Sequence, residues 1–161
     1  MSIISSTKKS YIAGFLDGDG CVMYQLIKRA GYKHGYQIRA SIVFYQKTKN
    51  RPHLEWLKTI FNVGYIRNRN DDMTEYTIVG LKNVEEILKL LMPYLRLKKP
   101  HAKKAIEINK LLKGENNLNK FIKAATLVDD FKELNYSKKR INTSKELIKF
   151  LRQNKLYPRN D

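Results

Sequence analysis

The stretch YIAGFLDGDGCV (residues 11–22) decides how the rest of the chain is interpreted. Its two aspartates, Asp17 and Asp19, stand among glycines directly after an apolar run. This acidic segment is unusual, because the chain carries 32 Lys and Arg against 15 Asp and Glu, a formal net charge of +17. The segment could be a calcium loop, a polar helix end followed by a turn, or a helix end that holds a catalytic metal.

Spacing excludes the calcium loop. An EF-hand loop that began at Asp17 would need an oxygen ligand at its fifth position, Gly at its sixth and Glu at its twelfth. Those positions hold Cys21, Val22 and Lys28. Spacing alone leaves the two kinds of helix end open.

Composition limits the partners of the chain. With 161 residues and 42% hydrophobic content, the chain can bury the core of one compact domain. The charge of +17 favours an anionic partner. No apolar run approaches the roughly 18 residues that a membrane span needs, and the basic residues are spread along the chain. We therefore expect nucleic acid as the partner and no membrane.

Cysteine content and the N-terminus bear on the compartment. Cys21 is the single cysteine, so an internal disulfide is excluded, which suits a reducing compartment. The first residues lack the pattern of a secretion signal. Abundant Lys, Asn, Ile and Tyr, all with A/T-rich codons, favour an organelle such as a chloroplast or mitochondrion.

The clearest period in the chain lies in YQIRASIVFYQ (36–46). Alternate apolar residues from Ile38 to Phe44 share one face, and polar residues occupy most of the other, which predicts a half-buried antiparallel strand. Three further strands are expected at 21–28, 63–69 and 74–80. Helices are expected at 11–16 (capped by Ser10), 53–61, 82–92, 101–112, 118–134 and 144–154.

This order, α-β-β-α-β-β-α plus C-terminal helices, predicts an α+β fold. One antiparallel sheet should carry helices on one face. We expect a single domain over residues 1–161, with a core at about 8–135 and a C-terminal basic loop and helix at 136–161.

The first helix has a face of small residues. Gly14 and Gly18 lie four apart with Ala13 nearby, and small residues let two helix backbones approach closely. A second copy of the helix would bring two Asp19 carboxylates together, and divalent metals would relieve their repulsion. The predicted dimer interface is Ala13, Gly14, Asp17 and Gly18.

Several stretches of the chain resemble one known protein family. IAGFLDGDG (12–20) resembles the motif of the LAGLIDADG homing endonucleases. QKTKNR (46–51), VGYIRNR (63–69), PYLRLKKPHA (93–102) and VDDFKELNYSKKR (128–140) resemble, in the same order, its single-motif, homodimeric branch. The resemblance implies a saddle-shaped antiparallel sheet in the DNA major groove, and motif helices at the interface of a homodimer.

The resemblance also implies site roles, residue by residue. Asp19 should bind the metal, with the Gly18 carbonyl as an additional ligand. Gln46 should help to place the attacking water, and Lys98 should stabilise charge or organise water. Asp17 should have a structural role, in capping or in interface hydrogen bonds.

One position departs from the family pattern. The family generally has Arg or Lys four residues after the glutamine, and here that position is Asn50. Either a one-residue shift lets the next residue, Arg51, serve in its place, which we favour, or the site works with the weaker partner Asn50.

The implied activity is site-specific cleavage of double-stranded DNA at a long pseudo-palindromic target. The homodimer would hydrolyse one phosphodiester per strand across the minor groove with Mg²⁺ and leave short 3′ overhangs. Mn²⁺ could substitute, and Ca²⁺ could bind without supporting cleavage. The alternative is a non-cleaving nucleic-acid-binding protein or an intron RNA maturase of the same fold, and only the maturase would have RNA as its partner.

The alternation of the strands and the implied fold select the same face for DNA. Arg, Gln and Glu can pair with base edges in the major groove, and basic loops usually grip phosphates. The predicted DNA-binding residues are Gln25, Arg29, Tyr32, Gln37, Arg39, Ser41, Arg67, Arg69, Glu75, Thr77, Ser137, Lys138, Lys139 and Asn142.

Overall fold

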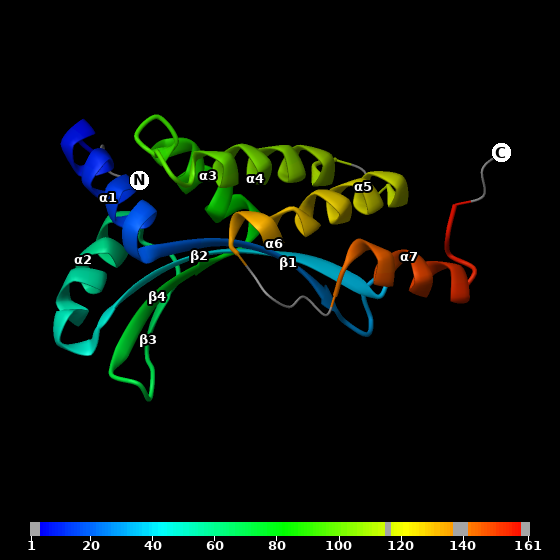
Figure 1. Cartoon of the computed structure of the whole chain (residues 1–161), viewed down its shortest axis with the longest axis horizontal. Coiled ribbons are helices and arrows are strands. Elements are labelled where there is room, and N and C mark those ends of the chain that lie inside the picture. Colours follow the sequence, from blue (N-terminus) through cyan, green and yellow to red (C-terminus); the bar gives the residue numbers. More distant parts are fainter. Residues whose placement is uncertain (1–3, 115–116, 137–141, 159–161) are drawn as a thin grey trace. The chain divides into compact units, whose positions relative to one another are not determined.

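The computed structural model describes residues 4–114, 117–136 and 142–158. Its four strands form an open antiparallel sheet in the order β1-β2-β4-β3 (Figure 1). The strands are β1 (Gly20–Lys28), β2 (Tyr36–Lys47), β3 (Tyr65–Asn68) and β4 (Met73–Val79). The predicted α+β class and all four predicted strands are confirmed.

The helices account for the rest of the regular structure. They are α1 (Ser6–Asp19), the 3₁₀ turn η1 (Thr48–Asn50), α2 (Arg51–Phe61), α3 (Leu81–Leu91), α4 (Lys99–Leu112), α5 (Leu118–Asp129), α6 (Phe131–Leu134) and α7 (Ser144–Gln153). Within the described ranges, no helix combines the length and the apolar character that a bilayer crossing requires.

The chain divides into two compact units. Unit 1 comprises Met1–Val22 and Ala40–Ala102, and unit 2 comprises Met23–Arg39 and Lys103–Asp161. The boundaries between the two units fall within β1, β2 and α4, so each of these elements has residues in both units.

The core of unit 1 forms where β2 pairs with β4. Ile42 lies opposite Ile78 and Phe44 opposite Tyr76, and these four side chains are fully buried. The apolar faces of α2 and α3 pack close to β4. Aromatic stacking continues into α1, because the ring of Phe15 lies 5.5 Å from that of Phe44.

Helix α1 is longer than expected. Its N-cap is Ser5, whose side chain accepts a hydrogen bond from the backbone N–H of Lys8, so the predicted cap at Ser10 is wrong. Residues 6–10 are polar and mostly exposed, so the sequence has no apolar periodicity that would predict the first turns of the helix. The helix ends at Asp19, where the N–H of Gly20 bonds to the Leu16 carbonyl.

In unit 2 a predicted helix is interrupted. The expected single helix over 118–134 divides into α5 and α6 at Asp130. After this break Phe131 is fully buried and stacks on Tyr24 of β1, at 5.1 Å between ring centroids. The Tyr24 hydroxyl in turn donates to Asn109 of α4 at 3.0 Å. The break therefore accompanies a tertiary contact that helix periodicity does not reveal.

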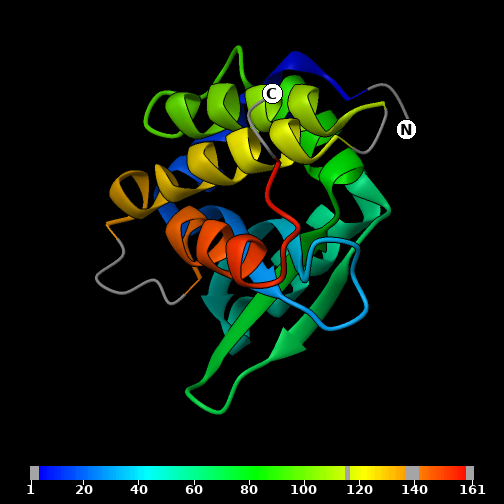
Figure 2. The same cartoon turned by 90° about the vertical axis from the view of Figure 1, so that its right-hand side faces the viewer.

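Helix α7 is fixed to α5 and to the β1–β2 hairpin. The Asp129 carboxylate accepts hydrogen bonds from the N–H and the hydroxyl of Ser144, and α5 and α7 lie side by side (Figure 2). Gly35 has a φ of +68° and lies against the Phe150 ring, so a side chain there would be strained and would collide with the ring.

The buried hydroxyl of Tyr76 gives a test of the unit 1 core. It donates to the Val63 carbonyl at 2.6 Å, and burial raises the pKa of Tyr76 above its ordinary value of 10.0. We expect Tyr76→Phe to lower the free energy of unfolding by about 1 kcal/mol, because the Val63 carbonyl loses its donor. Urea denaturation at pH 7 measures this change.

The same residue predicts a dependence on alkaline pH. Since folding raises this pKa, the stability from neutral Tyr76 is complete below about pH 10 and is lost as pH rises further. Tyr76→Phe should therefore lose less stability above pH 10 than the unsubstituted chain. Tyr65→Phe, at a side chain 44% exposed, is the control. Equal alkaline losses in the unsubstituted chain and Tyr76→Phe would contradict the prediction.

Candidate active site

The foot of α1 and the end of β2 meet in unit 1. Asp19 is the last residue of α1 and is exposed, while Gln46 is half-buried near the end of β2. The Gln46 amide nitrogen Nε2 donates to Asp19 Oδ2 at 3.1 Å. Two residues 27 positions apart, both predicted as site residues, are thus brought into contact.

Asn50 extends this contact. It ends the 3₁₀ turn that follows β2, and its Nδ2 donates to Gln46 Oε1 at 2.9 Å. Because Asn50 occupies the oxygen of the Gln46 amide, the nitrogen of that amide is directed at Asp19. Sequence reasoning singled out Asn50 only as a departure from the family pattern. The one signal for this contact was the four-residue spacing from Gln46.

Asp17 fixes the segment before α4. Its Oδ2 accepts hydrogen bonds from the backbone N–H of Arg96 at 2.7 Å and of Leu97 at 3.2 Å, and its Oδ1 accepts from that of Lys98 at 2.8 Å. A carboxylate beside the start of α4 also lies at the favourable end of the helix dipole.

Lys98 is held by the same residue. Its half-buried ammonium Nζ donates to the Asp17 carbonyl oxygen at 2.7 Å. Burial raises the pKa of the Cys21 thiol above its ordinary value, and the charge of Lys98 opposes that rise. Lys98 therefore lies within electrostatic reach of the start of β1, just beyond Asp19.

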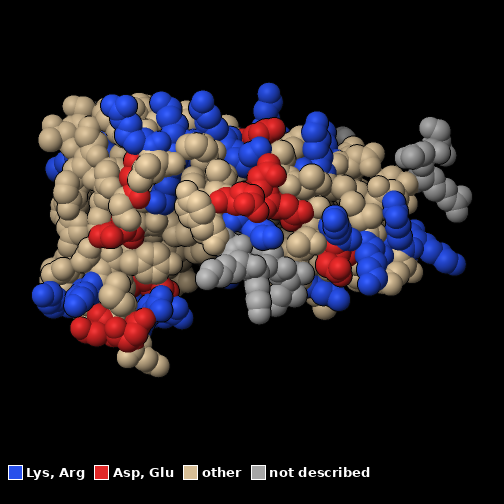
Figure 3. Space-filling model, in the orientation of Figure 1, with Lys and Arg blue, Asp and Glu red and all other residues tan. Residues whose placement is uncertain are grey.

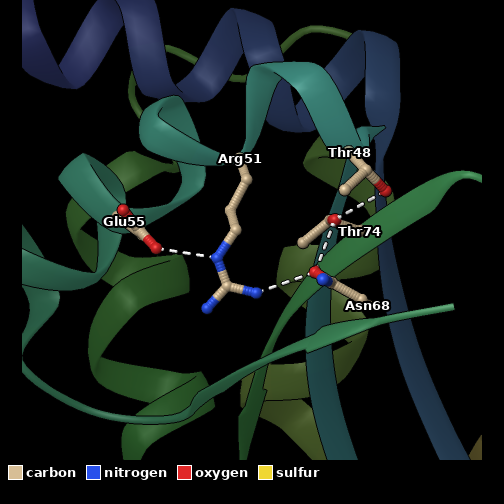
Figure 4. A network of polar contacts seen from close by, with 5 residues as sticks. All are labelled: Thr48, Arg51, Glu55, Asn68 and Thr74. Atoms are coloured by element: carbon tan, nitrogen blue, oxygen red, sulfur yellow. Dashed lines mark hydrogen bonds and ion pairs between the residues drawn. The ribbon is translucent and has the colours of Figure 1, made fainter.

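Arg51 forms its hydrogen bonds with residues other than Asp19 and Gln46. Its Nε donates to Glu55 and its Nη1 to Asn68, each at 2.7 Å (Figure 4). Asn68 Oδ1 also accepts from the Thr74 hydroxyl, at 2.9 Å. The structure thus places Arg51 between α2 and β3 and does not bring it together with Asp19 and Gln46.

A cavity of about 500 Å³ opens beside Asp19 and Gln46. Lys49, Asn50 and Pro52 form its side toward η1 and α2, and the rings of Tyr11, Phe15 and His53 line the remainder. The Tyr11 hydroxyl and His53 Nε2 are 3.1 Å apart. Sequence reasoning did not find this aromatic wall, because His53 has no ligand spacing to other histidines.

The predicted DNA-binding residues differ widely in exposure. Gln25, Arg29, Tyr32, Arg39, Arg67 and Arg69 are exposed, while Gln37 and Asn142 are half-buried. Ser41 and Thr77 are each only 5% exposed and Glu75 is 8% exposed. Ser137, Lys138 and Lys139 lie outside the described residues.

Several of these predicted DNA-binding side chains are paired with one another. Arg67 forms an ion pair with Glu75 at 2.8 Å, and Arg69 lies 4.0 Å from the same carboxylate. In unit 2, Arg29 donates to Gln37 at 3.3 Å and lies over the ring of Tyr32. These contacts hold long side chains in defined positions, although exposed pairs of this kind stabilise the fold little.

Positive charge is widely distributed. Figure 3 shows many Lys and Arg side chains on the face in view, with fewer acidic side chains among them. This distribution suits a long polyanionic partner, since each cation close to a phosphate adds to the attraction.

The oxygens at the end of α1 are of a kind that could hold a metal. Of the last carbonyls of this helix, that of Leu16 accepts from Gly20 and that of Asp17 accepts from Lys98. The Gly18 carbonyl and the Asp19 carboxylate are hard oxygen donors next to them, the kind that Mg²⁺ and Ca²⁺ prefer. Among the described residues there is no group of three or more His, Cys, Asp and Glu that could hold a metal.

Comparison with known proteins identifies the family of the chain. A family model described as LAGLIDADG endonuclease matches residues 12–114, a span that contains Asp17, Asp19, Gln46, Asn50 and Lys98. The DNA endonuclease I-CvuI of Chlorella vulgaris is 36% identical over 133 residues, which are 83% of this chain and 83% of that protein. The DNA endonuclease I-CreI of Chlamydomonas reinhardtii is 34% identical over 135 residues, 83% of this chain and 82% of that protein.

Solved structures agree with the sequence relatives. The crystal structure of I-CvuI in complex with its DNA target in the presence of Ca matches with a TM-score of 0.86 and 33% identity, covering 91% of this chain and 94% of that one. The archaeal intron-encoded homing endonuclease I-Vdi141I complexed with DNA matches with a TM-score of 0.81 at 19% identity, over 94% of this chain and 98% of that one, and supports the fold alone. The motif at the foot of α1, the fold and the relatives agree: the chain belongs to the LAGLIDADG endonuclease family.

Proposed function

We propose that this chain is a site-specific, double-stranded DNA homing endonuclease that acts as a homodimer and hydrolyses phosphodiester bonds with Mg²⁺. The observation that carries the proposal is the hydrogen bond from Gln46 to Asp19 beside an open cavity, at the motif shared with the family. Relatives named as DNA endonucleases cover most of the chain, and I-CvuI has been crystallised with uncleaved DNA of the I-CreI target in the presence of Mg and with its own target in the presence of Ca.

The donor chemistry fits a divalent ion. Asp19 would hold it through a carboxylate oxygen, and the Gly18 carbonyl would be a second ligand. When bound, such an ion supplies Lewis-acid stabilisation of the phosphate and lowers the pKa of a coordinated water. The protein itself orients groups around the reacting phosphate, which is the larger part of catalysis in reactions of this type.

Gln46 and Lys98 have distinct tasks in this proposal. The Gln46 amide, fixed by Asn50 on one side and Asp19 on the other, would orient the attacking water. Lys98 would place positive charge near the scissile phosphate, in a position fixed by its bond to the Asp17 carbonyl. A fixed charge of this kind needs no rearrangement as negative charge develops.

Exposed groups on unit 1 support the homodimer. A Cβ atom built at Gly14 or at Gly18 would meet nothing within 4 Å among the residues that the structure describes, so no contact there explains either glycine. Tyr11 on the same helix is 53% exposed, and Leu97, next to Lys98, is 72% exposed. A second α1 helix packed on this surface would cover apolar groups and would bring two Asp19 residues together. Ala13, which was also expected there, is fully buried in its own chain with Ile12 and Leu16, so it offers no surface to a partner.

The catalytic role of Asp19 gives the first test of the proposal. Asp19→Asn removes the charge that attracts the metal, so we expect Mg²⁺-dependent cleavage to fall by at least about a hundredfold. Cleaved sites would first be selected from a randomised duplex library, and the rate would then be measured on the selected duplex. Binding of that duplex without any cleavage by the unsubstituted chain would favour the non-cleaving alternative.

Asp17 should behave in the opposite way. Asp17→Asn leaves fewer acceptors for three backbone N–H groups, so we expect the free energy of unfolding to fall by about 1–3 kcal/mol. Asp19→Asn is the matched control, and its stability should stay close to that of the unsubstituted chain. Urea denaturation compares the two, and equal stability losses would contradict this division of roles.

The substitution Gly14→Ala tests whether α1 packs against a second copy of itself. In an isolated helix this change stabilises by roughly 1 kcal/mol, whereas a methyl group between closely packed helices holds the two backbones apart. We expect weaker self-association, measured as a larger dimer dissociation constant by analytical ultracentrifugation. Asn119→Ala, at an exposed position of α5, is the control and should leave association unchanged. An unsubstituted chain that is monomeric even on DNA would rule out the dimer.

A further inference from the structure

The cavity beside Asp19 contains one strong cation. Among the described residues that line it, Lys49 is the only Lys or Arg, and it shares the cavity with Asp19, Gln46 and Asn50. Its side chain is exposed, and no ion pair or hydrogen bond joins its ammonium to another described residue. An ammonium that forms no ion pair or hydrogen bond with another described residue, in the cavity that Asp19 also lines, is available to an anionic ligand.

The backbone of Lys49 is held on both sides. Thr48, before it, accepts a hydrogen bond from Thr74 through its hydroxyl at 3.1 Å, and its N–H donates to the Asp72 carbonyl at 2.9 Å. Asn50, after it, donates to Gln46. The turn that carries Lys49 is therefore tied both to β4 and to the Gln46–Asp19 pair.

Neither of the neighbouring cations lines this cavity. Arg51 donates to Glu55 and Asn68, and moving it to the cavity would break an ion pair and a second hydrogen bond, both at 2.7 Å (Figure 4). Lys98 is fixed outside the cavity lining by its bond to the Asp17 carbonyl. Asn50 is neutral, so it can orient Gln46 but cannot neutralise charge.

Phosphodiester hydrolysis requires such a charge. Negative charge accumulates on the phosphoryl oxygens as water adds to phosphorus, and a cation within reach stabilises this state more than it stabilises the bound substrate. We propose that Lys49, and not Arg51, is a catalytic residue that contacts the scissile phosphate from the η1 turn. The inference rests on the proposed endonuclease function and names the residue that supplies the charge missing at Asn50.

Two substitutions at one position isolate the charge. Lys49→Met keeps the length of the side chain and removes the ammonium, whereas Lys49→Arg keeps the positive charge. Lys82→Met, at an exposed lysine of α3 in the same unit, is the matched control. The rate constant of cleavage is measured in single turnovers, with Mg²⁺ and saturating protein on a selected duplex. The affinity for that duplex is measured separately in Ca²⁺ as a function of salt.

We expect Lys49→Met to lower the saturated rate constant by at least about tenfold, because an interaction made mainly in the transition state is lost. Lys49→Arg should retain most of the rate, and Lys82→Met should retain all of it. Arg51→Ala should lower the thermal unfolding temperature, with a smaller loss of rate than Lys49→Met.

Two results would overturn the inference while leaving the endonuclease function in place. A Lys49→Met chain that binds more weakly, with a salt slope smaller by about one and an unchanged saturated rate, would make Lys49 a contact to phosphate in the ground state only. A larger rate loss in Arg51→Ala than in Lys49→Met, with the fold retained, would assign the charge to Arg51. Absence of cleavage by the unsubstituted chain would instead reject the proposed function and this inference with it.

Discussion

The arrangement of the site depends on the Asp17 carboxylate. It binds backbone N–H groups about 80 residues away in the chain, directly before α4. The carbonyl of the same residue binds the Lys98 ammonium. Because Asp17 and Asp19 lie in one helical turn, these hydrogen bonds hold residues 96–98 to the end of the helix that carries Asp19. One side chain thus connects the end of the first helix with the start of the fourth.

Much of the fold could be predicted from local patterns. The alternation from Ile38 to Phe44 identifies β2 without help from other residues, and Pro52 marks the start of α2. Where prediction failed, the deciding contact was distant or the pattern was absent. The polar first turns of α1 have no apolar period, and the break at Asp130 accompanies the packing of Phe131 on Tyr24.

The candidate site, too, could be predicted only in part from the sequence. The resemblance to a family motif selected Asp19, Gln46 and Lys98, and the structure places the first two in direct contact. Neither motif nor spacing could tell which way Asn50 and Arg51 point. The direction of Arg51 depends on Glu55 and Asn68, which accept hydrogen bonds from its guanidinium. The direction of Asn50 depends on the Gln46 amide oxygen, which accepts a hydrogen bond from it. Alternation also placed Ser41 and Thr77 on the DNA face, but it could not indicate that both are almost completely covered in the free chain.

The network around Arg51 has a consequence for how such a protein can change over time. Asn68 receives Arg51 from α2 and Thr74 from β4, and Thr74 also holds Thr48 at the start of η1 (Figure 4). The third strand, β3, carries the predicted DNA-binding residue Arg67, and through Asn68 it shares hydrogen-bond partners with the turn that carries Lys49 and Asn50. Substitutions in this strand that change the DNA target would also disturb the turn that carries Lys49 and Asn50. Recognition and cleavage would have to evolve together, which favours small steps between related target sequences over abrupt exchanges of whole strands.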